Sequence, residues 1–385
     1  MILNIISQYS DRTVSNNWNP GMKLIIILIL LLYSDYASSA SISIAFIDHK
    51  DSQGDIAPIA LTHSIIIVDK YGTLYSIDIN DENQLHWKLN LSHSKKICKI
   101  SLACYGEQLF CVVDTILHAI NVNNGLVIWS QELTAPVSSA MSFINDKLTI
   151  LTIDNYLHIL DVQNGRVLWS YDNGLNHLRR EYSISPAIYA NKIIAPFSNG
   201  ELITFNEEGK KLWSQKLAIK SLETIFTDIT TTPRLGKRII VTTNNSYIYG
   251  IDLESGSIIW SQSLKVKNTS EIEEYEYILS ENIKQKIERI FIVTQDNRLL
   301  GLNIQNGEII WHSNYIQDTE LFAPFLHENQ LWLISNKGVI LNFQCDLYDI
   351  PQVIKIPDNV FHTPVFTHDK IYVTTYEYGV FFIRK

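Results

Sequence analysis

Short apolar runs alternate with polar residues along the chain, and six of them end in tryptophan at nearly the same place in a unit of roughly forty residues. Aligned on the tryptophans, the units read LYSIDINDENQLHW, LHAINVNNGLVIW, LHILDVQNGRVLW, LITFNEEGKKLW, IYGIDLESGSIIW and LLGLNIQNGEIIW. The tryptophans are Trp87, Trp129, Trp169, Trp213, Trp260 and Trp311. Alternation with a period of two is typical of strands, and a repeat of this length is typical of propeller blades. The pattern therefore predicts an all-β propeller.

A second turn signal upstream of each tryptophan raises the number of units from six to eight. Each such turn contains Asp, Asn, Ser or Gly between two apolar runs; the first lies at residues 69–72 and the last at residues 377–379. The units at residues 331–343 and 371–383 keep this hairpin and lack the terminal tryptophan. We therefore predict a single domain, residues 41–385, that folds as an eight-bladed β-propeller of four-stranded antiparallel blades.

The last unit ends at Lys385 with room for three strands, which would leave its blade with an unpaired edge. Residues 42–47, ISIAFI, form a strand-like run that belongs to no unit. Because a closed propeller leaves few edges, we predict that this N-terminal strand completes the last blade.

The repeated Asn/Asp-x-x-x-Gly segments predict tight turns, since glycine accepts a positive φ that other residues resist. The tryptophan that follows falls on the outer strand, where its ring can fill the space between neighbouring blades while its N–H finds an acceptor. We therefore assign the six tryptophans to structure rather than to a ring of ligand contacts.

The N-terminal region has the pattern of a secretory signal. Lys23 precedes an unbroken apolar run at residues 24–32, and small residues follow up to Ala40. The run is much shorter than the ~20 apolar residues that a membrane span requires. We expect translation to begin at Met22, cleavage to follow Ala40, and residues 1–40 to be absent from the mature domain.

Composition narrows the function classes. Apolar residues make up 46% of the chain and charged residues 18%, which predicts a continuous folded core. The net charge of -9 has the wrong sign for a protein that neutralises phosphates, so nucleic acid is not expected as a partner.

Three of the four cysteines, Cys98, Cys104 and Cys111, lie in one predicted hairpin region and form no CxxC pair. The sequence leaves two alternatives open for these three residues: buried free thiols, or a disulfide between two of them.

Candidate chemistry is sparse. His118 and His158 occupy equivalent places in two units, which repetition explains without a metal, and no carboxylate or third ligand recurs beside them. The sequence contains no nucleophile elbow, P-loop or dinucleotide fingerprint. We assign no catalytic, cofactor-binding or metal-binding residue.

Three connections break the repeat, and partner contacts on repeat scaffolds are usually built from such loops. Residues 173–181 join the third and fourth units, and residues 222–233 join the fourth and fifth. Because both enter neighbouring blades at the same stage, we expect them to open side by side on one face. The charged residues 265–288 are interpreted as an extended surface loop.

The units ending in Gly-x-x-x-Trp resemble the repeat of pyrroloquinoline quinone dehydrogenase-like propellers over nearly the whole mature chain. The quinoprotein dehydrogenases of this group carry an adjacent-cysteine disulfide and a calcium site. This chain has no adjacent cysteine pair and no recognisable acidic calcium cluster.

The chain resembles more closely the family of the outer membrane protein assembly factor BamB, a non-enzymatic branch that uses no cofactor. The resemblance implies a scaffold of the BAM complex whose two loops bind the POTRA domains of BamA. The residues that match the family's loops are Leu178, Arg179 and Glu181 in the first, and Asp228, Thr231, Thr232 and Pro233 in the second. Asn176 stands where the family commonly has an apolar residue, and Thr230 replaces an aspartate.

The same resemblance implies a periplasmic protein of a Gram-negative bacterium, peripheral to the outer membrane and monomeric outside the complex. Known members are lipoproteins, but this chain has no cysteine before Cys98 and hence no lipobox. Nascent outer membrane proteins are a further partner to consider, because exposed blade edges can pair with extended strands. The alternatives are a quinone-dependent dehydrogenase and a periplasmic interaction propeller with another partner.

Overall fold

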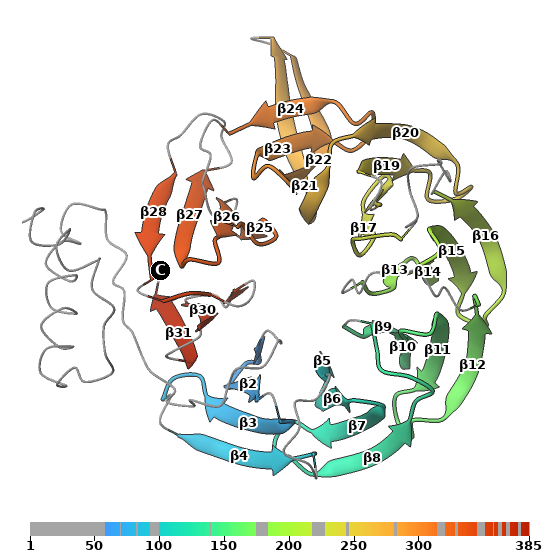
Figure 1. Ribbon diagram of the computed structural model, residues 1–385, viewed down its shortest axis with the longest axis vertical. Helices are drawn as coiled ribbons and strands as arrows, with labels where there is room; N and C mark the ends of the chain where they lie inside the picture. Colours follow the sequence, from blue (N-terminus) through green and yellow to red (C-terminus); the bar gives the residue numbers. More distant parts are fainter. Residues whose placement is uncertain are drawn as a thin grey trace, which may run out of the picture.

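The computed structural model describes residues 58–384, except for residues 70, 82–83, 93–99, 139, 175–183, 218–227, 244–245, 281–282, 314–319, 328–329, 345–350, 357, 361–363, 367–369 and 376–378. In this part of the chain every regular element is a β-strand, and the strands form antiparallel sheets arranged in a ring (Figure 1). Seven sheets have four strands, and we number them blades 1 to 7 in chain order. One further sheet at the C-terminal end has three strands.

The first four blades follow one another along the chain. Blade 1 comprises β1 (Ile59–Ala60), β2 (Ser64–Val68), β3 (Thr73–Asp78) and β4 (Leu85–Asn90); blade 2 comprises β5 (Ile100–Tyr105), β6 (Gln108–Val113), β7 (Ile116–Asn121) and β8 (Val127–Glu132). Blade 3 comprises β9 (Ser142–Ile144), β10 (Lys147–Leu151), β11 (Tyr156–Asp161) and β12 (Val167–Asp172); blade 4 comprises β13 (Ala187–Tyr189), β14 (Lys192–Pro196), β15 (Glu201–Asn206) and β16 (Lys211–Lys216).

The remaining sheets continue in the same order. Blade 5 comprises β17 (Arg234–Leu235), β18 (Ile239–Thr242), β19 (Tyr247–Ile251) and β20 (Ile258–Ser263); blade 6 comprises β21 (Val266–Ser280), β22 (Ile283–Thr294), β23 (Leu299–Asn303) and β24 (Ile309–His312). Blade 7 comprises β25 (Phe325–His327), β26 (Gln330–Ile334), β27 (Val339–Gln344) and β28 (Gln352–Lys355), and the C-terminal sheet comprises β29 (Val365–Phe366), β30 (Lys370–Thr375) and β31 (Gly379–Arg384).

The core lies between consecutive blades and is built from their middle strands. All five residues of β2 are buried, whereas the outer strand β8 alternates between exposed and half-buried positions. Phe110 of β6 and Leu148 of β10 belong to one buried cluster that joins blades 2 and 3. Middle strands are therefore covered on both faces, which is why they read as continuous apolar runs.

The repeated tryptophans lie between blades. The Trp87 indole N–H donates a hydrogen bond to the Val122 carbonyl in the next blade, with 2.7 Å between the heavy atoms. Its ring lies against Gly125, whose φ is +70° and where a Cβ would stand 2.7 Å from the ring. Glycine is therefore needed for close approach as well as for the turn.

The same contact recurs around the ring. The indole N–H groups of the next four tryptophans donate to carbonyls one blade further on: Trp129 to Val162, Trp169 to Glu207, Trp213 to Leu253 and Trp260 to Ile304. Trp311 packs edge-on against the rings of Phe291 and Phe343, with centroids 5.5 and 6.0 Å away.

The structure has seven four-stranded blades, not the eight predicted from the sequence, because the C-terminal sheet consists of three described strands. Its hairpin β30–β31 lies where the eighth unit was expected. The predicted fourth strand, residues 42–47, lies outside the described residues, so closure of the last sheet by this segment stays a prediction. The predicted signal at residues 1–40 also lies outside them.

The ring nevertheless closes through side-chain packing. Tyr372 of β30 is 1% exposed and shares a buried cluster with Ile65 of β2 and Tyr75 of β3. The last sheet thus packs on the first blade although the two are far apart in sequence.

The interpretation of residues 265–288 as a surface loop is wrong. They form most of a long antiparallel hairpin in which β21 pairs with β22. Glutamate and lysine have low strand propensity, and the charges hid an alternation with Ile and Tyr that only the pairing of two strands reveals.

The chain path defines two faces of the ring. Because each blade has four antiparallel strands in chain order, the connections between blades and the turns between second and third strands share one face, which we call the connection face. Turns between first and second strands, and between third and fourth, lie on the opposite face.

Candidate partner-binding site

The two predicted loops both open on the connection face. Residues 173–181 run from β12 toward β13, and residues 222–233 run from β16 toward β17, so the loops belong to neighbouring blades. Residues 175–183 and 218–227 lie outside the described part, and with them Leu178, Arg179 and Glu181. The geometry of the site is therefore described from the residues at the ends of the two loops.

Asn155 holds the start of the first loop. Its side-chain N–H donates to the Gly174 carbonyl at 3.0 Å, and its backbone carbonyl accepts from Asn173 N–H at 3.3 Å. Its side-chain oxygen accepts from the Ser198 hydroxyl at 2.8 Å, which ties blade 3 to blade 4. The residue is 3% exposed with φ of +68°, a conformation that asparagine tolerates better than most residues. Asn155 is thus a buried clamp at the loop base.

The end of the first loop is held from two sides. The Ser138 hydroxyl of blade 3 donates to the Ile184 carbonyl at 3.0 Å. The Ser185 N–H donates to Thr232 Oγ1 at 3.0 Å. Ser185 lies after the first loop in the connection between β12 and β13, and Thr232 belongs to the second loop, so this bond ties the two connections together at their bases.

The second loop continues into blade 5 through a threonine ladder. Thr230 N–H donates to the Thr242 carbonyl at 2.8 Å, and the two hydroxyls lie 2.7 Å apart. Thr231 Oγ1 accepts from Thr242 N–H at 3.1 Å. The Thr231 hydroxyl, predicted as a partner contact, is therefore used within the blade.

Asp228 is the first residue of the described end of the second loop and is 1% exposed. The next residue, Ile229, forms a β-bridge with Thr243. This placement differs from the surface contact expected for Asp228, because the carboxylate is covered in the free chain.

Replacing Asn155 with alanine is expected to lower the free energy of unfolding by about 1–3 kcal/mol, because buried hydrogen-bonding groups lose their partners. We also expect trypsin to cleave faster after Arg179 and Arg180, since the loop base is released. Denaturant unfolding and limited proteolysis measure the two effects. Asn164→Ala, at an exposed turn on the opposite face, is the matched control. Equal cleavage of both variants would show that Asn155 does not hold the base of the first loop.

His118 and His158 occupy equivalent positions in blades 2 and 3 and make equivalent cross-strand contacts. Nδ1 of His118 lies 2.8 Å from the Ser130 hydroxyl, and Nδ1 of His158 lies 2.8 Å from the Ser170 hydroxyl. Burial lowers the pKa of both imidazoles, because desolvation disfavours the charged ring. Over the described residues, no three His, Cys, Asp or Glu side chains gather in a way that could hold a metal ion. Cys104 is a free thiol and Cys111 is buried, whereas Cys98 lies outside the described residues.

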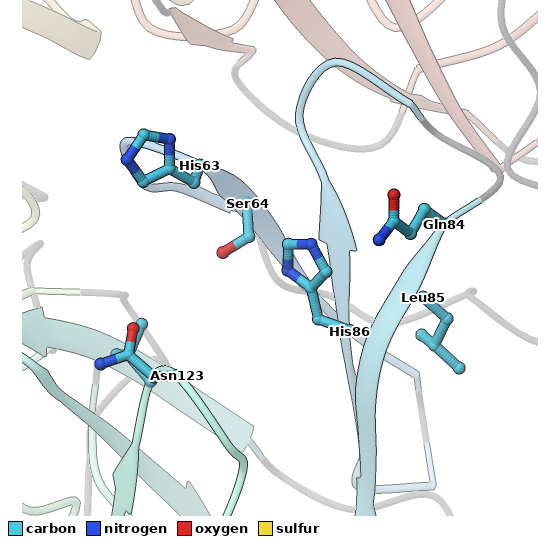
Figure 2. A pocket seen from close by; sticks show the side chains of 7 residues that line it. His63, Ser64, Gln84, Leu85, His86 and Asn123 are labelled. Carbon is cyan, nitrogen blue, oxygen red and sulfur yellow. The ribbon is translucent and has the colours of Figure 1, made fainter.

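Figure 2 shows a polar pocket on the opposite face, between blades 1 and 2. Its lining residues are His63, Ser64, Gln84, Leu85, His86, Val122 and Asn123. His86 Nε2 lies 3.2 Å from Asp78 Oδ2. The backbone N–H groups of Asn80 and Asp81 and the His86 ring hold the pKa of the Asp78 carboxyl below its usual range. The pocket offers hydrogen-bonding groups but lies on the face away from the two loops.

The family model described as outer membrane protein assembly factor BamB matches residues 71–246 and 235–344, which together span most of the chain. The chain belongs to the BamB family. BamB of Salmonella typhimurium is 23% identical over 299 residues, covering 74% of this chain and 73% of that protein. An uncharacterized protein of Rickettsia prowazekii is 21% identical over 337 residues, 78% of each chain.

Two solved structures share the fold. BamB from Moraxella catarrhalis has a TM-score of 0.71 at 14% identity, covering 90% of this chain and 100% of that one. A europium-containing methanol dehydrogenase has a TM-score of 0.63 at 9% identity, covering 89% and 85%. Because a BamB protein and an enzyme share this architecture, the fold alone does not select between scaffold and dehydrogenase.

No helix in the described portion of this BamB-family chain is long and apolar enough to cross a membrane. Sequence reasoning found the two loops by their irregularity but missed Asn155 and Ser138, which hold the two ends of the connection that carries the first loop. Asn155 lies in the turn between β10 and β11, but its bonds to Gly174 and Ser198 follow only from the neighbouring loop and blade.

Proposed function

We propose that this chain is a non-enzymatic scaffold of the outer-membrane β-barrel assembly machinery. It binds the POTRA domains of BamA and thereby promotes the assembly and insertion of outer membrane proteins. The observation that carries the proposal is that the two irregular loops of a BamB-family propeller are joined at their bases by the Ser185–Thr232 hydrogen bond.

The buried frame suggests a division of roles between the loops. Leu178, Arg179 and Glu181 supply the contact with BamA: an apolar group, a hydrogen-bonding or stacking cation and a carboxylate. Asp228 and Thr231 hold the second loop in place, since Asp228 is buried and the Thr231 hydroxyl is hydrogen-bonded within blade 5. A rigid base reduces the ordering cost of binding.

The proposed site of action is the periplasm, at the outer membrane. The resemblance to the family and the signal-like N-terminus support this location. The dehydrogenase alternative rests on the likeness to the methanol dehydrogenase, which is one of fold. No described residue adds support to it.

Arg179→Glu is expected to weaken binding to the BamA POTRA domains by at least about tenfold, because arginine at the centre of an interface often dominates affinity and the reversed charge repels the site it served. Affinity is measured with the purified protein and purified POTRA domains, and co-purification from envelope extracts gives a second reading. Melting temperature should not change.

Arg166→Glu is the matched control, since Arg166 is exposed on a turn of the opposite face. It should bind as the unchanged protein does. Full binding by Arg179→Glu would overturn the assignment of the loop, and absence of binding by the unchanged protein would overturn the partner.

A further inference from the structure

Part of the β21–β22 hairpin extends beyond the sheet of blade 6. β22 pairs with β23 only over residues 289–293, whereas its pairing with β21 continues to residue 283. Figure 1 shows the hairpin reaching past the outer strand β24. We call residues 273–287 the ribbon. As a turn between first and second strands, it belongs to the face opposite the two loops.

The root of the ribbon is fixed by blade 5. The Lys237 N–H donates to a Glu288 carboxylate oxygen at 2.6 Å, and Ile272 packs in the buried cluster between the blades. A Cβ on Gly236 would lie 2.8 Å from the Glu288 carboxylate and 3.1 Å from Ile272, so glycine lets the two elements approach. The ribbon therefore leaves the ring from a defined base.

One edge of the ribbon continues the ladder of the blade. The Glu288 carbonyl accepts from Ile304 N–H, which shows that the backbone groups of Glu288 face the β23 side. Backbone groups of a strand alternate between its two edges, so those of Lys286 and Lys284 face the same side. Over the described residues no strand pairs with them there.

The ladder also sorts the ribbon residues into two faces. Register places Glu276 opposite Lys286 and Ile278 opposite Lys284, whereas Tyr275 lies opposite Ile287 on the other face. One face thus carries Glu276, Lys284 and Lys286 together with Ile278, and the other carries Tyr275, Tyr277 and Ile287 together with Gln285. A two-stranded hairpin alone is marginally stable in water, and a third strand with an apolar face adds the missing packing.

We propose that the ribbon is a strand-addition arm that binds an extended protein segment along the edge of β22 at Lys284 and Lys286. The segment alternates acidic with apolar residues: its acidic positions share the face of the two lysines, and its apolar positions share the face of Tyr275 and Ile287. Backbone hydrogen bonds provide affinity and the alternation provides selection. This activity is separate from BamA binding, which uses the other face.

The probe is a short fluorescein-labelled peptide that alternates glutamate with valine, titrated with the full mature chain at low salt and followed by fluorescence anisotropy. We expect saturable binding and slowed amide exchange at Lys284 and Lys286. A peptide of the same composition in scrambled order, and one alternating lysine with valine, should each bind at least about tenfold more weakly.

Three variants locate the site. Lys286→Pro removes only an outward N–H and should weaken binding at least about tenfold, since proline is accepted at strand edges but cannot donate. Lys284→Glu with Lys286→Glu should shift preference to the lysine–valine peptide. Replacement of residues 275–287 by Asn-Gly, which keeps Glu288, should abolish binding without changing the melting temperature.

Lys210→Glu, at an exposed turn away from the ribbon, is the matched control and should bind normally. Equal affinity for the scrambled peptide, equal binding by the shortened chain, or no binding of the alternating peptide would each overturn the proposal. POTRA affinity, measured on the same variants, should be unchanged, so failure of this proposal and failure of the BamA assignment are separate results.

Discussion

Replacing Trp87 with alanine is expected to lower the free energy of unfolding by about 3–5 kcal/mol, as for other buried aromatic side chains cut to alanine. Trp87 is 8% exposed, fills the contact between blades 1 and 2, and donates to the Val122 carbonyl. Its removal leaves a cavity against Gly125 and an unsatisfied carbonyl. Denaturant unfolding followed by circular dichroism measures the change.

Trp87→Phe separates the contribution of ring packing from that of the hydrogen bond, because it keeps an aromatic ring and loses the N–H donor. It should cost distinctly less than alanine. Gly125→Ala approaches the same contact from the other side and should also destabilise, since its Cβ would overlap the indole ring and its φ is +70°. If both alanine variants unfold like the unchanged protein, tryptophan packing does not hold the blades together.

Deleting residues 41–48 is expected to lower the free energy of unfolding by at least about 4 kcal/mol, because each buried Ile or Phe contributes about 1.5–3 kcal/mol. The deleted segment has Ile42, Ile44 and Phe46 at alternate positions. The described C-terminal sheet has three strands with β31 at its edge, which is the position for an added strand. Thermal unfolding of the mature chain with and without the segment measures the loss.

Point variants check that the strand, rather than chain length, matters. Ile44→Asp with Phe46→Asp should reproduce most of the loss, whereas Ser43→Asp, on the alternate face, should have little effect. An unchanged melting temperature after deletion would mean that the packing of Tyr372 on blade 1 closes the ring without a fourth strand.

The repeat made the architecture predictable from the sequence, and particular residues show why. Trp129 and Gly165 recur with their neighbours in several units, so their contact is encoded many times over. The C-terminal sheet could not be counted in this way, because it lacks the tryptophan and its fourth strand was expected from the other end of the chain. The ribbon was missed because strand pairing between residues 273 and 289 is not visible in local composition.

For the candidate site, the sequence located two irregular loops and the family to which they belong. It did not show that Asp228 is buried, since burial depends on what the rest of the fold places over a residue.

The sequence by itself determined the propeller class, the turns and the tryptophan contacts, because these depend on short-range alternation and on a unit that repeats. Only the tertiary structure decided how Asn155, Ser185 and Thr232 hold the two loops and how the ribbon leaves blade 6. Those contacts join segments that occur once each and lie far apart along the chain, so no local pattern encodes them.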